Sequence, residues 1–103
     1  MLEVIIRPRA QLDLESIYIH IAVVLGAPSA AHSTLDALFQ AIERVADLPD
    51  LGSIFESERL TRTYRRTLAR NYWIYYSVED SHLVVWRVFH TRQDVNDSTL
   101  IDL

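Results

Sequence analysis

The sequence predicts an α+β fold in which an antiparallel hairpin of two helices covers one face of an antiparallel β-sheet. Two consecutive segments repeat apolar residues at steps of three and four, and three later segments have the apolar content and alternation of strands. The turns that join these segments are short. We therefore expect the order β-α-α-β-β-β, beginning with an N-terminal strand, in a single domain over residues 1–103.

Composition places the chain among globular proteins, because 50% of its residues are hydrophobic and 23% are charged. Cysteine is absent, which excludes disulfides, thiolate zinc sites and cysteine nucleophiles and suits a reducing cytoplasm. The N-terminal stretch is a poor signal peptide, since Glu3 interrupts a short apolar run. No stretch approaches the ~20 apolar residues of a transmembrane helix. We expect a cytoplasmic protein without membrane contact.

The first strand and the first helix are predicted from residues 2–26. Residues 2–6 (LEVII) form a short apolar run that predicts a strand, and Pro8 suits the first turn of a helix, where its missing N–H is not needed. Apolar residues then recur on one helical face up to Gly26, at Leu14, Ile17, Tyr18, Ile21 and Leu25.

The second helix is predicted to begin at the turn formed by residues 27–29, with Ser29 as its N-cap, and to stop before Pro49. Its apolar face has the same spacing, at Ala31, Leu35, Leu38, Ile42 and Val45. The connection between the helices is short enough to require an antiparallel hairpin.

Three further strands are expected over residues 64–68, 72–78 and 83–90, pairing as an antiparallel meander after a looser segment. Alternation divides the middle strand into a core face and an outer face; the core face would carry Tyr72, Ile74, Tyr76 and Val78, and the outer face Trp73, Tyr75 and Ser77. In the last strand, alternation groups Val85 and Phe89 with Arg87. That face is assigned to the outside, because an unpaired charge is costly to bury. Residues 96–103 are expected to form a short strand or a loose tail.

Charge is distributed unevenly along the chain. Residues 59–78 contain five arginines and no acidic residue, so they carry a charge of +5. Because the formal net charge of the chain is −4, the other residues together carry −9. All ten basic residues are arginine. Arginine is a poor acid or base near neutral pH, but its planar guanidinium binds phosphates and carboxylates in two-point contacts. Any proton transfer would therefore use His, Tyr or a carboxylate.

The same segment is rich in aromatic side chains, which favours a surface that binds a polyanion or a partner chain. The candidate partner-binding residues are Arg65, Arg66, Arg70, Trp73, Tyr75 and Arg87. Arg65 and Arg66 point in opposite directions on a strand, so at most one of them can face a partner there. Arg59 and Arg62 are most simply part of a solvated face, and Trp86 is expected to be a core ring.

We expect neither a metal nor a cofactor. The scattered histidines His20, His32 and His82 show no metal-ligand spacing with acidic residues. Two glycines in the whole chain make a glycine-rich phosphate loop improbable.

Several short patterns occur in an order that resembles the RelE/ParE superfamily of bacterial toxins, and within it the ParE branch. An opening Arg7-Pro8-Arg9-Ala10 precedes a helix with Asp13-Leu14, Ile17-Tyr18 and Ile21-Ala22, and Leu48-Pro49 with Gly52 follows the second helix. The sheet region carries Arg65-Arg66, then Tyr72-x-Ile74-x-Tyr76, then Val88-x-His90 with Arg92 and Asp94. The resemblance covers almost the whole chain.

This resemblance implies the toxin of a type II toxin–antitoxin module, of the plasmid stabilisation kind. Its partner would be a ParD-like antitoxin whose partly disordered C-terminal segment wraps the toxin. ParE members poison DNA gyrase and are not known as hydrolytic enzymes, so gyrase is the expected target and no catalytic residue is expected. The resemblance also allows a homodimer within a toxin–antitoxin heterotetramer.

The alternative implied by the superfamily is a RelE-like, ribosome-dependent endoribonuclease that cuts messenger RNA in the A site. Such chemistry needs a base, an acid and cations for the phosphate, and His90, Arg92 and Arg65 are the candidates. RelE-type toxins usually use lysines, and this chain has none. Trp73 also stands where those toxins tend to carry an arginine. The sequence therefore favours the gyrase-directed branch.

Overall fold

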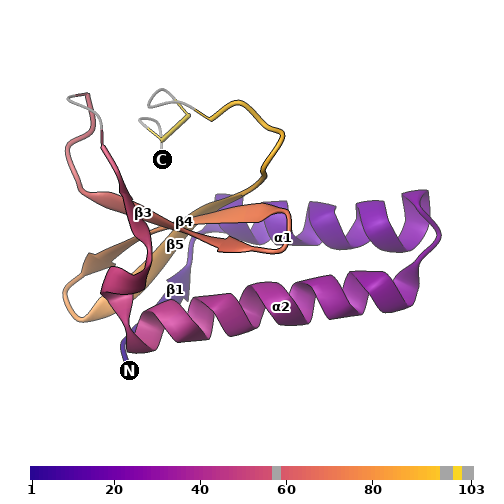
Figure 1. Ribbon diagram of the computed structural model, residues 1–103, viewed down its shortest axis with the longest axis horizontal. Helices are drawn as coiled ribbons and strands as arrows, with labels where there is room; N and C mark the ends of the chain where they lie inside the picture. Colours follow the sequence, from indigo (N-terminus) through magenta and orange to yellow (C-terminus); the bar gives the residue numbers. More distant parts are fainter. Residues whose placement is uncertain (57–58, 96–98, 101–103) are drawn as a thin grey trace.

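The computed structural model describes residues 1–56, 59–95 and 99–100, and it has the predicted order of elements with one strand added. A helical hairpin lies along one side of a twisted sheet and extends well beyond it (Figure 1). The elements are β1 (Glu3–Ile6), α1 (Pro8–Ile19), the π-helix η1 (His20–Val24), α2 (Pro28–Asp47), the 3₁₀-helix η2 (Pro49–Leu51), β2 (Ser53–Phe55), β3 (Tyr64–Ala69), β4 (Tyr72–Glu79) and β5 (His82–His90).

The sheet has the order β1-β5-β4-β3-β2. Strands β3, β4 and β5 form the predicted antiparallel meander, while β1 pairs in parallel with β5, so the sheet is mixed. The added strand β2 pairs antiparallel with β3, where Ser53 lies opposite Arg66. Its three residues are too few for an alternation pattern to reveal a strand in the sequence.

The two helices begin at prolines. Pro8 stands at the start of α1, as predicted, and Pro28 starts α2 in the same way. The prediction of Ser29 as N-cap is wrong, because the cap residue is Ala27, which has no side-chain cap bond. A proline in the first turn removes one of the unpaired N–H groups that a cap would otherwise satisfy. The end of the first helix widens into η1, where the Leu25 N–H donates to the His20 carbonyl at 2.9 Å.

The main core lies between the helical hairpin and the sheet. It confirms the predicted core face of β4, because Ile74 and Tyr76 are fully buried and Tyr72 packs against them. Val78 lies on the same face, opposite Leu83 of this core, but it is 47% exposed because it is close to the β4–β5 turn. The helices contribute Ala10, Leu14, Leu38, Ala41, Ile42, Val45 and Ala46.

Strict alternation fails in β5 because of a β-bulge opposite the step from Tyr75 to Tyr76. Tyr75 pairs with Arg87 and Tyr76 pairs with Val85, which leaves Trp86 as the extra residue. The predicted grouping of faces is therefore wrong before the bulge, at Val84, Val85 and Trp86, and it holds after the bulge, at Val88 and Phe89. Val85 and Val88 both join the helix-side core, whereas Val84, Trp86 and Phe89 belong to a second cluster.

This second cluster covers much of the face of the sheet that lacks helices. Tyr75, expected on the outer face, has no exposed surface. Tyr64 and Trp86 pack with it, and Leu60, Val95 and Leu100 from the flanking segments complete the cover. The rest of the 96–103 prediction lies outside the described residues. Within the described part of the chain, no helix is long and apolar enough to cross a membrane.

Candidate partner-binding site

Four side chains from three neighbouring strands form a cationic and aromatic cluster on the face without helices. Arg66 of β3 lies opposite Tyr75 of β4, and cross-strand partners share one face of a sheet. The Arg66 guanidinium carbon lies 4.1 Å from the ring centre of Trp73 and 5.7 Å from that of Phe55. Its Nη1 donates to the Tyr75 hydroxyl at 3.1 Å. We call Arg66, Trp73, Tyr75 and Phe55 the Arg66 cluster.

The aromatic side chains of the Arg66 cluster hold the Arg66 guanidinium in place. Among the described residues, no carboxylate compensates the positive charge of Arg66. Arg66 and Trp73 are both half-buried, and no ion pair joins Arg66 to a carboxylate of the described segments. An arginine stacked on a tryptophan face loses little further freedom on binding, and its remaining N–H groups suit carboxylate or phosphate oxygens. The cluster can therefore bind an anionic group beside an aromatic ring.

A second stacked arginine lies on the same face, nearer the start of β3. The Arg62 guanidinium lies 4.3 Å from the ring centre of Trp86, and Arg7 approaches the same indole at 5.3 Å. The Arg62 Nε lies 3.2 Å from a carboxylate oxygen of Glu79. The prediction that Arg62 belongs to a solvated face is thus wrong, because its side chain lies against Trp86. Trp86 is confirmed as a core ring, with 6% of its surface exposed.

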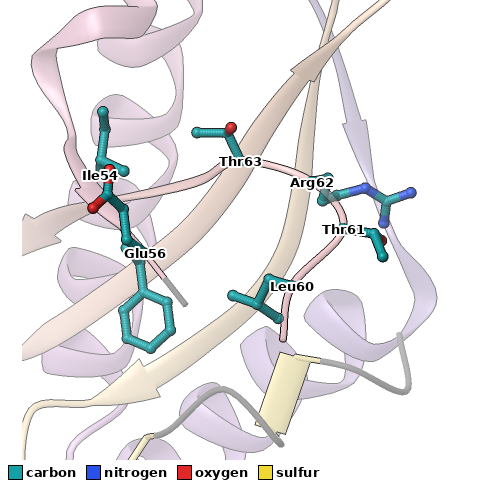
Figure 2. Close-up of a pocket in the computed structure, with 7 residues that line it drawn as sticks. Ile54, Glu56, Leu60, Thr61, Arg62 and Thr63 are labelled. Atoms are coloured by element: carbon teal, nitrogen blue, oxygen red, sulfur yellow. The ribbon is translucent and has the colours of Figure 1, made fainter. Parts of the chain in front are cut away.

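Residues 54–56 and 60–63 line a cleft of about 440 Å³ next to the stacked arginines. Figure 2 shows its lining side chains around the arch of the loop, with Arg62 directed away from Ile54 and Glu56. Ile54 is 46% exposed, and Leu60 is half-buried. The cleft thus offers apolar surface next to arginine, a combination typical of sites for peptide side chains.

Arg65 lies apart from the Arg66 cluster, as the alternation of β3 requires. Its Nη1 donates to the Gly52 carbonyl at 2.7 Å, and its Nη2 lies 3.5 Å from a carboxylate oxygen of Asp50. The Tyr76 hydroxyl joins the same segment, donating to the Pro49 carbonyl at 2.6 Å and accepting the Gly52 N–H at 3.0 Å. Arg65 therefore fixes the exit from α2.

Arg70 and Arg87 also make contacts within the protein. Arg70 has a φ of 53° in the β3–β4 turn, and its Nη2 donates to the Ser33 hydroxyl of α2 at 2.7 Å. Arg87 forms a two-point ion pair with Asp13 of α1, with N–O distances of 2.8 and 3.0 Å. Of the six predicted partner-binding residues, the structure brings Arg66, Trp73 and Tyr75 together. The three other arginines bond to groups of the protein itself, although Arg87 lies opposite Tyr75 and stacks on Phe89 at 4.3 Å.

The three residues proposed for RNA cleavage do not converge. Arg65 lies opposite Tyr76 on one side of β4, and His90 lies opposite Tyr72 on the other side. Strand geometry separates these positions by about 13 Å along the sheet and about 10 Å across it. Only Arg92 is near His90, whose Nδ1 accepts the Arg92 backbone N–H at 3.0 Å.

His90 instead contributes to a pocket of about 370 Å³ between α1 and the ends of β4 and β5. Its ring meets that of Tyr72 edge to face at 5.3 Å between centres, and burial raises the pKa of the Tyr72 phenol. Because a backbone N–H always donates, the neutral His90 ring carries its proton on Nε2. His20 lines the same pocket, although it lies 70 residues earlier in the sequence.

Nothing in the spacing of the histidines predicted that His20 and His90 share a pocket, because only the packing of α1 on the sheet brings them together. Phe55 and Arg7 were also missed as members of the arginine-bearing face, since they lie outside residues 59–78. Within residues 1–56, 59–95 and 99–100, no group of three or more His, Cys, Asp or Glu side chains is placed to hold a metal.

Comparison with known proteins identifies a family. Residues 4–95 match the family described as the ParE toxin of the type II toxin–antitoxin system parDE. No curated protein matches the chain in sequence.

Two solved structures share the fold at low sequence identity. One is the chromosomal ParDE toxin–antitoxin system from P. aeruginosa, with a TM-score of 0.71 and 18% identity over 87% of this chain and 96% of that chain. The other is the RelBE2 toxin–antitoxin complex from Mycobacterium tuberculosis, with a TM-score of 0.54 and 19% identity over 86% and 96% of the two chains. At this identity the likeness concerns the fold alone.

Proposed function

Because the chain belongs to the ParE toxin family of type II toxin–antitoxin systems, we propose that it acts in the cytoplasm by binding and inhibiting DNA gyrase. A cognate ParD-like antitoxin would neutralise it. In this account the toxin acts as a binding protein, and the Arg66 cluster is the surface that a macromolecular partner contacts. The observation that carries the proposal is the stacking of Arg66 on Trp73, which holds a cationic group ready beside an aromatic ring.

The antitoxin is proposed because the two similar structures are both toxin–antitoxin complexes. An acidic segment of the antitoxin would place a carboxylate on Arg66 and apolar side chains in the cleft lined by Ile54 and Leu60. The helical hairpin carries many of the acidic residues, whereas the arginines of residues 59–70 lie in the sheet region. An anionic ligand is therefore favoured on the arginine-bearing face and not on the hairpin.

The ribonuclease alternative has less support from geometry. It needs an acid, a base and a cation around one phosphate, but Arg65 is bonded to Gly52 and lies far from His90. The observation that best supports the ribonuclease alternative is the pocket lined by His20, Tyr72 and His90. That pocket also contains Asp13, but its carboxylate is already bonded to Arg87 and to the Val88 N–H.

The two functions are separated by one experiment with two arms. Purified chain is incubated with gyrase, ATP and supercoiled plasmid in one arm, and with ribosomes carrying messenger RNA in the A site in the other. We expect gyrase-linked, cleaved DNA in the first arm and intact message in the second. Cleaved message that is lost in His90→Ala but retained in Arg9→Ala, an exposed arginine of α1, would replace the gyrase account with the ribonuclease account.

A further inference from the structure

Two arginines from distant parts of the sequence meet at the buried indole of Trp86. The guanidinium carbon of Arg62 lies 4.3 Å from the centre of the indole ring, and that of Arg7 lies 5.3 Å from it. These two distances limit the separation of the two guanidinium carbons to 9.6 Å. We call Arg7, Arg62 and Trp86 the Trp86 site.

The indole and the carboxylate beside it are held by a chain of hydrogen bonds. The Trp86 Nε1–H donates to the Ser77 hydroxyl at 2.8 Å, and the Ser77 hydroxyl donates to Glu79 Oε2 at 3.1 Å. The other carboxylate oxygen of Glu79 lies 3.2 Å from the Arg62 Nε. The Trp86 site is therefore built on a fixed platform, because only 6% of the Trp86 surface is exposed.

Positive charge exceeds negative charge at the Trp86 site. Arg62 pairs with Glu79, whereas no ion pair joins Arg7 to a carboxylate in the part of the chain that the structure describes. The first turn of α1, directly after Arg7, contains no acidic residue. The buried Nε of Arg62 makes no hydrogen bond to the described residues. Two guanidinium groups with one carboxylate leave an excess of one positive charge, and Arg7 is exposed to solvent. The site is therefore suited to an anion.

We propose that the Trp86 site binds a phosphoryl group. A carboxylate has two oxygens in one plane and matches a single guanidinium fork, as Asp13 does with Arg87 in this structure. A phosphoryl group presents three acceptor oxygens in different directions, so it can accept hydrogen bonds from two guanidinium groups of different segments. Its negative charge would balance the excess at the site, and the exposed Arg7 side chain can adjust to it.

A nucleic-acid backbone and a small phosphate-bearing molecule both supply such a group. Because Trp86 is covered, its ring cannot stack on a base. A nucleic acid would therefore be held here through its backbone and without regard to base sequence. The proposal goes beyond the proposed function, since it does not depend on gyrase being the target.

The two tryptophans of the chain make the site observable. Trp73 reports on the Arg66 cluster and Trp86 on the Trp86 site, and the sequence has no other tryptophan. Nuclear magnetic resonance records one indole N–H signal for each, and Trp73→Phe assigns them. The purified full chain is titrated with sodium phosphate, with a short thymidine oligonucleotide and with sodium acetate, at a low ionic strength held constant with sodium chloride.

We expect inorganic phosphate to shift the Trp86 signal in a saturable way, and acetate to bind at least about tenfold more weakly. The oligonucleotide distinguishes the two sources of the phosphoryl group. Binding of the oligonucleotide at least about tenfold tighter than that of inorganic phosphate identifies a nucleic-acid backbone, which combines several phosphates. Weaker or equal binding identifies a small phosphate-bearing molecule.

Three variants test the assignment of residues. Arg7→Gln should weaken phosphate binding roughly three- to tenfold, because a charge-assisted contact is lost. Arg9→Gln is the matched control, since Arg9 is also exposed and lies on the other side of Pro8. Glu79→Gln should strengthen phosphate binding about threefold or more, because it removes the carboxylate that competes for Arg62. A merely structural contact between Arg62 and Glu79 would not produce this gain.

Four results would overturn the proposal. The Trp86 signal could respond to neither phosphate probe, acetate could bind as tightly as phosphate, Arg9→Gln could weaken binding as much as Arg7→Gln, or a folded Glu79→Gln could fail to bind phosphate more tightly. Circular dichroism verifies that each variant is folded, as expected for substitutions at exposed or half-exposed positions. The assay contains neither gyrase nor antitoxin, so its failure is distinguishable from a failure of the proposed function.

Discussion

At the scale of single residues, the close packing of Gly52 against Tyr76 contributes to the stability of the fold. Gly52 has a φ of −72°, which every residue type adopts, so its need for glycine is steric. A methyl group there would overlap the Tyr76 hydroxyl and lie within 2.9 Å of the Arg66 carbonyl oxygen. Gly52 also connects the exit of α2 to β2, so a clash there disturbs both layers.

We predict that Gly52→Ala lowers the free energy of unfolding by about 1–3 kcal/mol, the usual cost of overpacking. Urea denaturation measures this change. The same substitution is then measured in a Tyr76→Phe background, as a double-mutant cycle. Tyr76→Phe removes the hydroxyl that the added methyl group would overlap. Gly52→Ala should therefore be milder in the Tyr76→Phe background. Equal costs in both backgrounds would show that the Tyr76 hydroxyl is not the source of the clash.

Tyr76 also makes stability depend on alkaline pH. Burial raises the pKa of its phenol, with Asp50 acting in the same direction, while the Gly52 N–H and Arg65 lower it in part. The unfolded tyrosine ionises near pH 10 and the folded one at higher pH, so the unfolded state binds fewer protons above pH 10. We predict that the free energy of unfolding falls as the pH rises above about 10.

Urea denaturation between about pH 8.5 and 11 measures this dependence, and each buried tyrosine contributes a slope of at most about 1.4 kcal/mol per pH unit. Tyr72, whose pKa is also raised by burial, contributes to the same slope. Tyr76→Phe should reduce the slope but not abolish it. A variant slope equal to that of the unmodified chain would show that Tyr76 ionises as readily in the folded state as in the unfolded state.

At the scale of elements, Asp13 joins α1 to the edge of β5. Its carboxylate accepts the Val88 N–H at 2.9 Å and both bonds from Arg87, in a pair whose side chains are only 16% and 19% exposed. β1 pairs with β5 only as far as Val85, so Asp13 satisfies a strand N–H beyond that point. This contact explains how the strand can carry a charged residue beside the bulge.

We predict that Asp13→Ala destabilises the protein by about 2–4 kcal/mol, because it leaves the Arg87 charge and the Val88 N–H without their partner. Asp13→Asn should cost less, since an amide oxygen can still accept the Val88 N–H. Denaturation curves give the two costs, and hydrogen exchange at Val88 reports the strand contact directly. Equal stability and unchanged exchange in Asp13→Ala would refute this role.

The elements themselves were largely predictable from the sequence. Apolar spacing identified both helices, and alternation identified the three strands of the meander, because these patterns are local. The errors arise where tertiary structure overrides local pattern. The bulge at Trp86 shifts the faces of β5, β2 is too short to show alternation, and Pro28 makes a cap at Ser29 unnecessary.

The candidate site was less predictable than the fold. Arg66, Trp73 and Tyr75 were expected on one face, and the register of β3 and β4 places them there. The burial of Tyr75 depends on Phe55 and Phe89, which meet its ring edge to face from other strands. The contacts of Arg65, Arg70 and Arg87 depend on loops and helices far away in sequence, so no local pattern could assign them.

At the scale of the whole molecule, each part of the surface has a distinct character. The face without helices carries stacked arginines, the hairpin has an uncharged end, and the acidic residues elsewhere give the chain its net charge of −4. Such a division suits a protein that binds more than one macromolecule. The arginine-bearing face is the one we assign to the partner that neutralises the toxin.

The most direct test of this assignment is calorimetric titration of the cognate antitoxin into the unmodified chain, Arg66→Ala and Arg9→Ala at low salt. Arg66 is central and stacked, as interface hot spots are, so its loss should weaken binding by at least about tenfold, while Arg9→Ala binds like the unmodified chain. Thermal denaturation verifies that both variants are folded. If a folded Arg66→Ala binds the antitoxin with unchanged affinity, the Arg66 cluster is not the partner-binding surface.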